Sequence, residues 1–268
     1  MVLRIATLNL KLNHNCWELR KELIADQFAE LKPDMWALNE IHIPTGAGRW
    51  LERAATERTR VTYTLLQQSK TGEESRNQAE GLLTRHDVIE TSSLDYGCHH
   101  CVAQVSRFEI EGKSLDVYVT HLIGGHARML TALGKALGVT RVAARVQDYA
   151  RQYQVAQLLD WIRRRRDAAF TVVCGDFNAT LDERSIQLMS EVFRPTQDQS
   201  TAFTPLQETD GLPTHPDWKR FDRCIDYIWI NESIKLKASG LCFDKPAMDN
   251  PKLWPSDHVG VWADLEFV

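Results

Sequence analysis

The stretch Phe170-Thr171-Val172-Val173-Cys174-Gly175-Asp176-Phe177-Asn178 decides the fold, because a strand-like apolar run ends directly in a carboxylate and an amide. Asp176 and Asn178 lie two residues apart, so both side chains point to the same face if the strand continues through them. A second polar group, Ser256-Asp257-His258, borders the apolar run at residues 259–267. Polar side chains placed at the ends of buried strands favour an enzyme.

Strand-like runs rich in Val, Ile, Thr and aromatic residues recur along the chain, and several alternate with a period of two. We expect strands at residues 4–10, 35–39, 62–67, 81–84, 102–110, 115–121, 170–174, 224–230, 236–243 and 259–267.

Helical patterns fall between these runs. Asn15 and Glu18 resemble a capping box, and Lys32-Pro33 ends the helix that follows. Its buried face is expected to consist of Leu19, Leu23, Ile24, Phe28 and Leu31. Further helices are expected around residues 155–162, ending at the Arg163-Arg164-Arg165-Arg166 run, and at residues 182–190.

Three segments, residues 67–80, 124–149 and 194–223, are expected to be loops or insertions of the kind that carry substrate choice, and residues 124–149 have a helix-like pattern. The candidate site residues extend from Asn9 to His258, and no linker or internal repeat divides the chain. We therefore expect one α/β (α+β) domain over residues 1–268, with two packed sheets and helices outside.

Composition narrows the functional classes. The chain has 268 residues, 43% of them hydrophobic and 25% charged, and its net charge of −4 argues against a broad electrostatic grip on nucleic acid. A local basic groove remains compatible with that charge. Cys98-His99-His100-Cys101 has the spacing of a zinc site, but no second pair follows, which favours a turn at a strand edge.

The first residues form a strand-like run instead of a secretory leader, and no apolar stretch approaches the ~18 residues of a membrane span. We therefore expect a cytoplasmic protein without a transmembrane segment.

Six motifs, taken together, resemble the endonuclease/exonuclease/phosphatase superfamily, which includes DNase I-like nucleases, sphingomyelinases, inositol polyphosphate phosphatases and deadenylases. They occur in the expected order and cover nearly the whole chain: Thr7-Leu8-Asn9, Asn39-Glu40, Thr120-His121-Leu122, Gly175-Asp176-Phe177-Asn178, Ile225-Asp226-Tyr227 and Ser256-Asp257-His258. Asn39 departs from the pattern, in which glutamine is more usual. The resemblance implies a four-layer α/β sandwich, DNase I-like, with two mixed β-sheets flanked by helices and the site at one edge of the paired sheets.

The resemblance also implies a metal. Glu40 would be the principal Mg²⁺ ligand, because an ionised carboxylate suits a hard cation. Asn9 would contribute an amide oxygen or orient the metal's water, and Asp257 would bind the metal through water. Mn²⁺ is the expected substitute.

The remaining motif residues would carry the reaction. Asp226 would hold His258 as the general base, and Asp176 would orient or deprotonate the attacking water or bind a second metal. Asn178 and His121 would bind the phosphate oxygens, and His121 would alternatively protonate the leaving group. Glu80 is a candidate partner of His121.

These residues predict a metal-dependent phosphodiesterase, with DNA or RNA as the leading substrate. A sphingomyelinase-like lipid phosphodiesterase is the second interpretation. A sugar or inositol phosphate monoesterase is the third, and it would use Lys70, Arg76 or Lys219 to recognise further phosphates. A binding module that keeps the fold without catalysis is the non-enzymatic alternative. The sequence indicates no protein partner.

Overall fold

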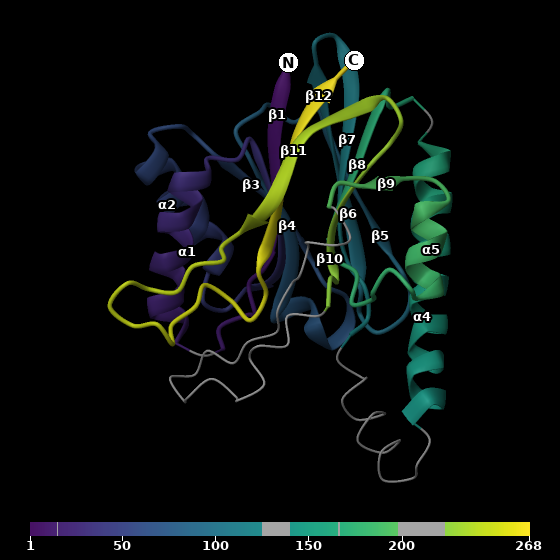
Figure 1. Ribbon diagram of the computed structural model, residues 1–268, viewed down its shortest axis with the longest axis horizontal. Helices are drawn as coiled ribbons and strands as arrows, with labels where there is room; N and C mark the ends of the chain where they lie inside the picture. The colour runs from purple at the N-terminus through teal and green to yellow at the C-terminus, as the bar shows by residue number, and fades with distance from the viewer. Residues whose placement is uncertain (15, 125–139, 166, 198–222) are drawn as a thin grey trace.

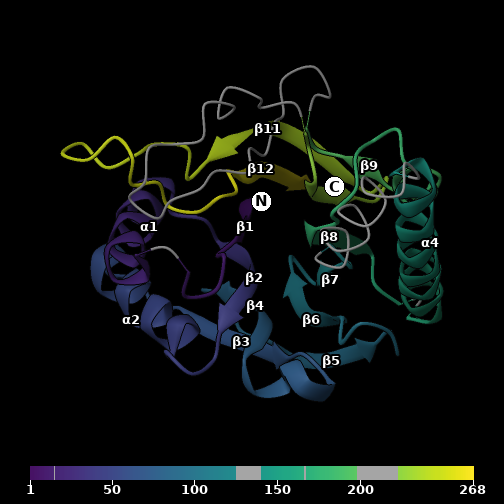
Figure 2. The same ribbon diagram turned by 90° about the horizontal axis from the view of Figure 1, so that it is seen from below.

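The computed structural model describes residues 1–14, 16–124, 140–165, 167–197 and 223–268. Two six-stranded mixed sheets pack face to face, with helices on both outer faces (Figures 1 and 2). Sheet A has the order β11-β12-β1-β2-β4-β3, and sheet B has the order β5-β6-β7-β8-β10-β9. This architecture confirms the expected four-layer α/β sandwich.

The strands of sheet A are β1 (Val2–Asn9), β2 (Met35–His42), β3 (Thr64–Ser69), β4 (Gln78–Thr84), β11 (Ile234–Cys242) and β12 (Gly260–Phe267). Those of sheet B are β5 (Glu90–Asp95), β6 (Val102–Ile110), β7 (Lys113–His121), β8 (Phe170–Asp176), β9 (Arg194–Pro195) and β10 (Asp226–Ile230). The helices are α1 (Trp17–Leu31), α2 (Ala47–Thr59), the 3₁₀ helix η1 (Gly72–Arg76), α4 (Thr140–Arg164) and α5 (Arg184–Ser190).

Three apolar layers hold the four structural layers together, and the period of two in the strands produces them. Leu3 and Ile5 of β1 contact the core between the sheets, whereas Ala6 and Leu8 belong to the cluster formed with α1 and α2. On β8, Val172 and Cys174 lie between the sheets, and Val173 joins the outer cluster that also contains residues of α4 and α5. Strands β1 and β8 therefore each bury both of their faces.

Strand directions bring one set of strand ends together. β1 and β2 run parallel, as do β7 and β8. β12 is antiparallel to β1, β4 to β2, and β10 to β8, so the beginnings of these three strands lie beside the ends of their partners. Polar residues at the ends of β1, β2, β7 and β8 therefore meet those at the starts of β4 and β10 and before β12.

The structure corrects several local expectations. Residues 67–80 are not one loop, because β3 continues to Ser69, η1 follows, and β4 begins at Gln78. Helix α2 and strand β5 were not expected. On α1, Leu19 is exposed and Arg20 is fully buried, because the helix turns its Trp17, Arg20, Ile24 and Phe28 side inward.

Other expectations agree with the structure or lie outside its described part. Cys98–Cys101 forms a turn between β5 and β6, in which the Cys101 N–H donates to the carbonyl oxygen of Cys98. Residues 140–149 belong to α4, whereas Asn15 and residues 125–139 and 198–222 lie outside the described residues. In the described part of the chain, no helix is long and apolar enough to cross a membrane.

Candidate active site

The candidate site lies where the inter-sheet face of both sheets changes from apolar to polar. Along β8, the inward positions are Val172, Cys174 and then Asp176. The same alternation places Asn9 after Leu3 and Ile5, and His121 after Val117 and Val119. Asn39, Glu80 and Asp226 occupy the corresponding inward positions of β2, β4 and β10. The site is thus the polar end of the inter-sheet core.

Glu40 departs from this alternation. The pairing of β2 with β4 shifts between Leu38 and Ile41, and Glu40 has φ +56°. A bulge with a left-handed residue costs free energy at a non-glycine position but redirects its side chain. The carboxylate of Glu40 is 25% exposed and its Oε1 lies 4.0 Å from His121 Nε2. The distortion therefore brings a solvent-accessible carboxylate next to the buried His121.

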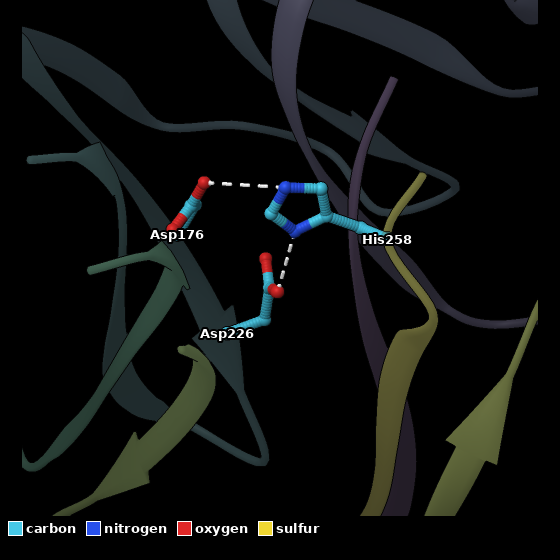
Figure 3. Close-up of side chains that lie close together, drawn as sticks. All are labelled: Asp176, Asp226 and His258. Carbon is cyan, nitrogen blue, oxygen red and sulfur yellow. Dashed lines mark hydrogen bonds and ion pairs between the residues drawn. The ribbon is translucent and has the colours of Figure 1, made fainter. Parts of the chain in front are cut away.

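His258 lies between two buried carboxylates (Figure 3). Its Nδ1 forms a 2.8 Å hydrogen bond with Asp226 Oδ2, and its Nε2 lies 3.8 Å from Asp176 Oδ2. Burial disfavours the imidazolium, but Asp226 and Asp176 outweigh burial and raise the pKa of His258 well above its ordinary value. Burial, reinforced by Asp226, raises the pKa of Asp176. The three groups form one electrostatically coupled unit.

Asp176 ends β8 in a turn. Its Oδ1 accepts a hydrogen bond from the Asn178 N–H at 2.8 Å, and its Oδ2 accepts one from Asn9 Nδ2 at 3.0 Å. Asn178 has φ +51°, and its Nδ2 donates to the carbonyl oxygen of Leu122 at 2.9 Å. Strand β8 ends at Asp176, so the condition for a shared strand face of Asp176 and Asn178 is not met. A turn of the Asx type brings Asn178 to the site rim instead.

His121 has a second set of buried partners. Its Nδ1 lies 3.4 Å from Glu80 Oε1 and 3.5 Å from Lys70 Nζ, and its Nε2 lies 3.6 Å from Asp176 Oδ2. Burial and Lys70 lower the pKa of His121, but Glu80 and Asp176 outweigh them, so that its pKa is raised. The expected pairing of Glu80 with His121 is present. Lys70 was expected to be a loop residue, yet it is buried against Glu80 at 3.5 Å.

Asn39 connects these groups across the two sheets. Its Nδ2 donates to Glu80 Oε2 at 2.7 Å and to the carbonyl oxygen of Thr120 at 3.1 Å. Its Oδ1 accepts a hydrogen bond from the Asp176 N–H at 2.9 Å. A fully buried amide with every strong contact satisfied fixes the relative position of its neighbours. The residue that departs from the superfamily pattern therefore has a clear structural role.

Two loops complete the site beside sheet A. Ser256 Oγ donates to the carbonyl oxygen of Asn9 at 2.6 Å and accepts a bond from the His258 N–H at 3.3 Å. This turn lets the adjacent residues Asp257 and His258 serve the same site. Arg20 holds both loops, because its guanidinium donates to the carbonyl oxygens of Leu10 and Pro255, each at 2.9 Å. Burial lowers the pKa of Arg20 to about 10.

The oxygen atoms of the candidate site are suitable ligands for a hard dication. Glu40 and Asp257 are partly exposed, with 25% and 16% of their side chains accessible, and Asn9, the last residue of β1, offers an amide oxygen. Mg²⁺ prefers oxygen ligands and keeps several waters, which such accessible carboxylates permit. The buried Asp226 Oδ1 has no hydrogen-bond partner among the described residues. Asp176, Asp226 and His258 also bring ligand atoms within 4.8 Å of one another.

The described site brings together Asn9, Glu40, His121, Asp176, Asp226, Asp257 and His258, and it places Asn178 at the rim. Sequence reasoning missed Arg20 and the buried position of Lys70. Arg20 was missed because a charged residue on an amphipathic helix is usually exposed to solvent. Its position four residues before Ile24, on the same helix face, could have indicated that Arg20 is buried.

The four-layer arrangement is that of DNase I-like proteins. Residues 6–258 match the model of the Endonuclease/Exonuclease/phosphatase family, and the chain belongs to this family. The activities in that name are hydrolyses of phosphoric esters. No curated protein sequence matched the chain.

Solved structures resemble the whole chain at low sequence identity. An endonuclease/exonuclease/phosphatase from Bacteroides vulgatus is 16% identical, with a TM-score of 0.73 and full coverage of both chains. D. rerio TDP2 complexed with single-strand DNA product is 16% identical, with 99% of each chain covered and a TM-score of 0.72. The human Nocturnin catalytic domain with bound sulfate is 17% identical, with a TM-score of 0.68 over 100% of this chain and 95% of that one. At such identity, these likenesses show the fold alone.

Proposed function

We propose that residues 1–268 act as one domain that hydrolyses phosphodiester bonds with Mg²⁺. The observation that carries this proposal is His258 between Asp226 and Asp176, beside the two accessible carboxylates of Glu40 and Asp257. The first set suits proton transfer from water, and the second suits a hard cation. Glu40, Asn9 and Asp257 would hold the metal, which would supply positive charge against the anionic phosphate.

His258 is the general base in this mechanism. Asp226 fixes the imidazole through Nδ1, so Nε2 is the nitrogen that accepts the proton of the attacking water. Asp176 lies on the Nε2 side, where its Oδ2 orients that water. Because Asp226 and Asp176 both stabilise the imidazolium, His258 readily accepts the proton of the attacking water.

His121 and Asn178 stabilise the reacting phosphate from the sheet B side. His121 directs Nε2 towards Asp176 and Glu40, so a proton on Nε2 faces the reaction centre. There it donates to a nonbridging oxygen or protonates the leaving group. Asn178 has a second amide hydrogen beyond the one bound to Leu122. Each such donor is worth roughly 3 kcal/mol of transition-state stabilisation when preorganised.

Nucleic acid is our leading substrate class. The family includes nucleases by name, and the TDP2 relative from D. rerio is a complex with single-strand DNA product. The monoesterase alternative is weakened because Lys70 is buried against Glu80 and does not extend to further phosphates. Arg76 is exposed at the end of η1, and Lys219 lies outside the described residues.

Hydrolysis of bis-p-nitrophenyl phosphate and p-nitrophenyl phosphate, with Mg²⁺, Mn²⁺ or EDTA, tests the proposal. We expect metal-dependent turnover of the diester that is lost in His258→Ala. His86→Ala is the matched control, because His86 also faces a carboxylate, Asp34 at 3.6 Å, but outside the site. Preference for the monoester would favour a phosphatase, and a binding module would keep its function in His258→Ala.

A further inference from the structure

Lys11 is the one residue of the β1–α1 loop whose charge reaches the proposed metal ligands in the described contacts. Its Nζ lies 3.4 Å from Asp257 Oδ2, and both side chains are mostly buried, with 17% and 16% exposed. Its backbone N–H donates to Asn9 Oδ1 at 2.9 Å. Lys11 therefore contacts two of the three residues to which the proposed function assigns the metal.

The backbone holds Lys11 there in an unfavourable conformation. Lys11 has φ +58°, a left-handed value that costs a non-glycine residue about 1 kcal/mol or more. The neighbouring carbonyl oxygens of Leu10 and Leu12 accept hydrogen bonds from the buried Arg20, and the carbonyl oxygen of Asn9 accepts one from Ser256 Oγ. These contacts fix the loop on both sides of Lys11. The backbone position from which the Lys11 side chain extends is therefore set by the fold.

Charge makes this contact incompatible with a metal bound at the same carboxylate. An ammonium and a dication a few ångströms apart repel each other, and the single negative charge of Asp257 cannot neutralise both. A lysine side chain is a compact point charge on a flexible stem, so it can exchange one anion for another without moving the backbone. The nearest anion that arrives with the metal is the phosphate of the substrate.

We propose that Lys11 is a counter-cation for Asp257 in the metal-free protein and a phosphate-binding residue in the loaded one. Its ammonium holds Asp257 in place until the metal binds that carboxylate, and it then binds a nonbridging oxygen of the phosphate ester. This inference rests on the proposed function. Lys11 would then weaken binding of the metal, with which it competes for Asp257, and strengthen binding of the phosphate ester.

Lys11→Met tests the proposal, because methionine keeps an unbranched stem and the same backbone strain while removing the charge. Mn²⁺ affinity is measured without substrate, from the free-ion electron paramagnetic resonance signal. We expect binding to become about three- to tenfold tighter, the range for a partly buried ion pair. The KM for bis-p-nitrophenyl phosphate, at saturating metal, should rise about tenfold with a smaller change in kcat.

Two variants serve as controls. Lys11→Arg keeps the charge and should bind Mn²⁺ within about twofold of the wild-type affinity. Lys21→Met removes a similarly buried charge whose described contacts are Glu18 and the ring of Trp50, so neither parameter should change. Unchanged or weaker Mn²⁺ binding in Lys11→Met overturns the proposal, as does an unchanged KM.

Glu40→Gln separates this outcome from failure of the proposed function. If the wild-type protein binds Mn²⁺ and Glu40→Gln does not, the metal assignment stands and the Lys11 result is decisive for the inference. If the wild-type protein binds no Mn²⁺, the metal part of the proposed function has failed, and the role of Lys11 fails with it.

Discussion

The side chain of Asn39 on sheet A accepts a hydrogen bond from the backbone of Asp176 on sheet B. The same amide donates to Glu80 and to the carbonyl oxygen of Thr120. One residue thus sets the distance between the two halves of the site. A side chain that is longer by one methylene, as in glutamine, would have to reposition all three contacts.

Asn39→Leu should lower both stability and activity. The substitution removes three buried hydrogen bonds, with Glu80 Oε2, the Thr120 carbonyl oxygen and the Asp176 N–H, which costs about 3 kcal/mol in the free energy of unfolding. Urea unfolding measures the loss, and diester hydrolysis measures kcat. Asn231→Leu is the control, because Asn231 also links backbone groups but lies away from the site. Equal kcat losses in both variants would contradict a positioning role for Asn39.

Gly175→Ala should be far more damaging than an ordinary change at a left-handed glycine. Gly175 has φ +136°, and a Cβ there would lie 2.0 Å from the carbonyl oxygen of Thr120. The clash moves β7 against β8 directly beside Asp176, so we expect a loss above about 3 kcal/mol. Gly112→Ala, at φ +76° with open space around its Cβ position, should cost only about 1 kcal/mol. Similar losses measured by urea unfolding would show that the close approach is tolerated.

The activity should rise with pH through the raised pKa of His258. The general base must be neutral at Nε2, and Asp226 and Asp176 keep it protonated to higher pH than an ordinary histidine. Asp226→Asn removes one of these charges, so the ascending limb of kcat/KM should move to lower pH. The plateau should fall by at least about 100-fold because the imidazole loses its orienting carboxylate.

The control for this pH profile is Asp116→Asn. Asp116 is a buried carboxylate paired with Arg107, and its described contacts do not include a candidate site residue. Its removal should leave the ascending limb in place. A limb that does not move in Asp226→Asn would assign the titrating group to another residue.

Glu40→Gly should abolish activity and make the protein more stable. Glycine accepts φ +56° without the strain that glutamate bears, which should raise the free energy of unfolding by about 1 kcal/mol. Glu111→Gly relieves the same kind of strain, φ +53°, in the turn before β7, and should keep full activity. A less stable Glu40→Gly protein would mean that the carboxylate stabilises the fold more than its backbone strains it.

The positions of polar residues at the ends of strand-like apolar runs, together with the family resemblance, predicted much of the site. Asp176, Asn9 and His121 each continue the inward series of a buried strand, so their side chains had to meet once the sheets packed. The side-chain directions of Glu40 and Asn178 were harder to predict from the sequence. A bulge at Glu40 and a left-handed turn at Asn178 break the period of two. Local sequence does not specify such distortions, which the surrounding contacts impose.

The burial of two charged residues was also not predicted from the sequence. Arg20 was not among the residues expected on the buried face of α1, and Lys70 was expected to lie in a loop, since both residue types are usually exposed. Tertiary partners reversed that expectation, since Arg20 found backbone carbonyl groups from two loops and Lys70 found Glu80. Helix α2 was missed because only five of its residues, Ala47, Gly48, Leu51, Ala54 and Ala55, are buried, and they are mostly small.

The position of β12 between β1 and β11 has a consequence for biosynthesis. Asp257 and His258 directly precede this strand, whereas the other site residues come from segments translated earlier. The segments that form sheet B and much of sheet A are therefore translated before His258, the proposed general base. If the proposed function holds, the site is completed only when β12 pairs with β1, so hydrolysis would begin only after this last strand has joined sheet A.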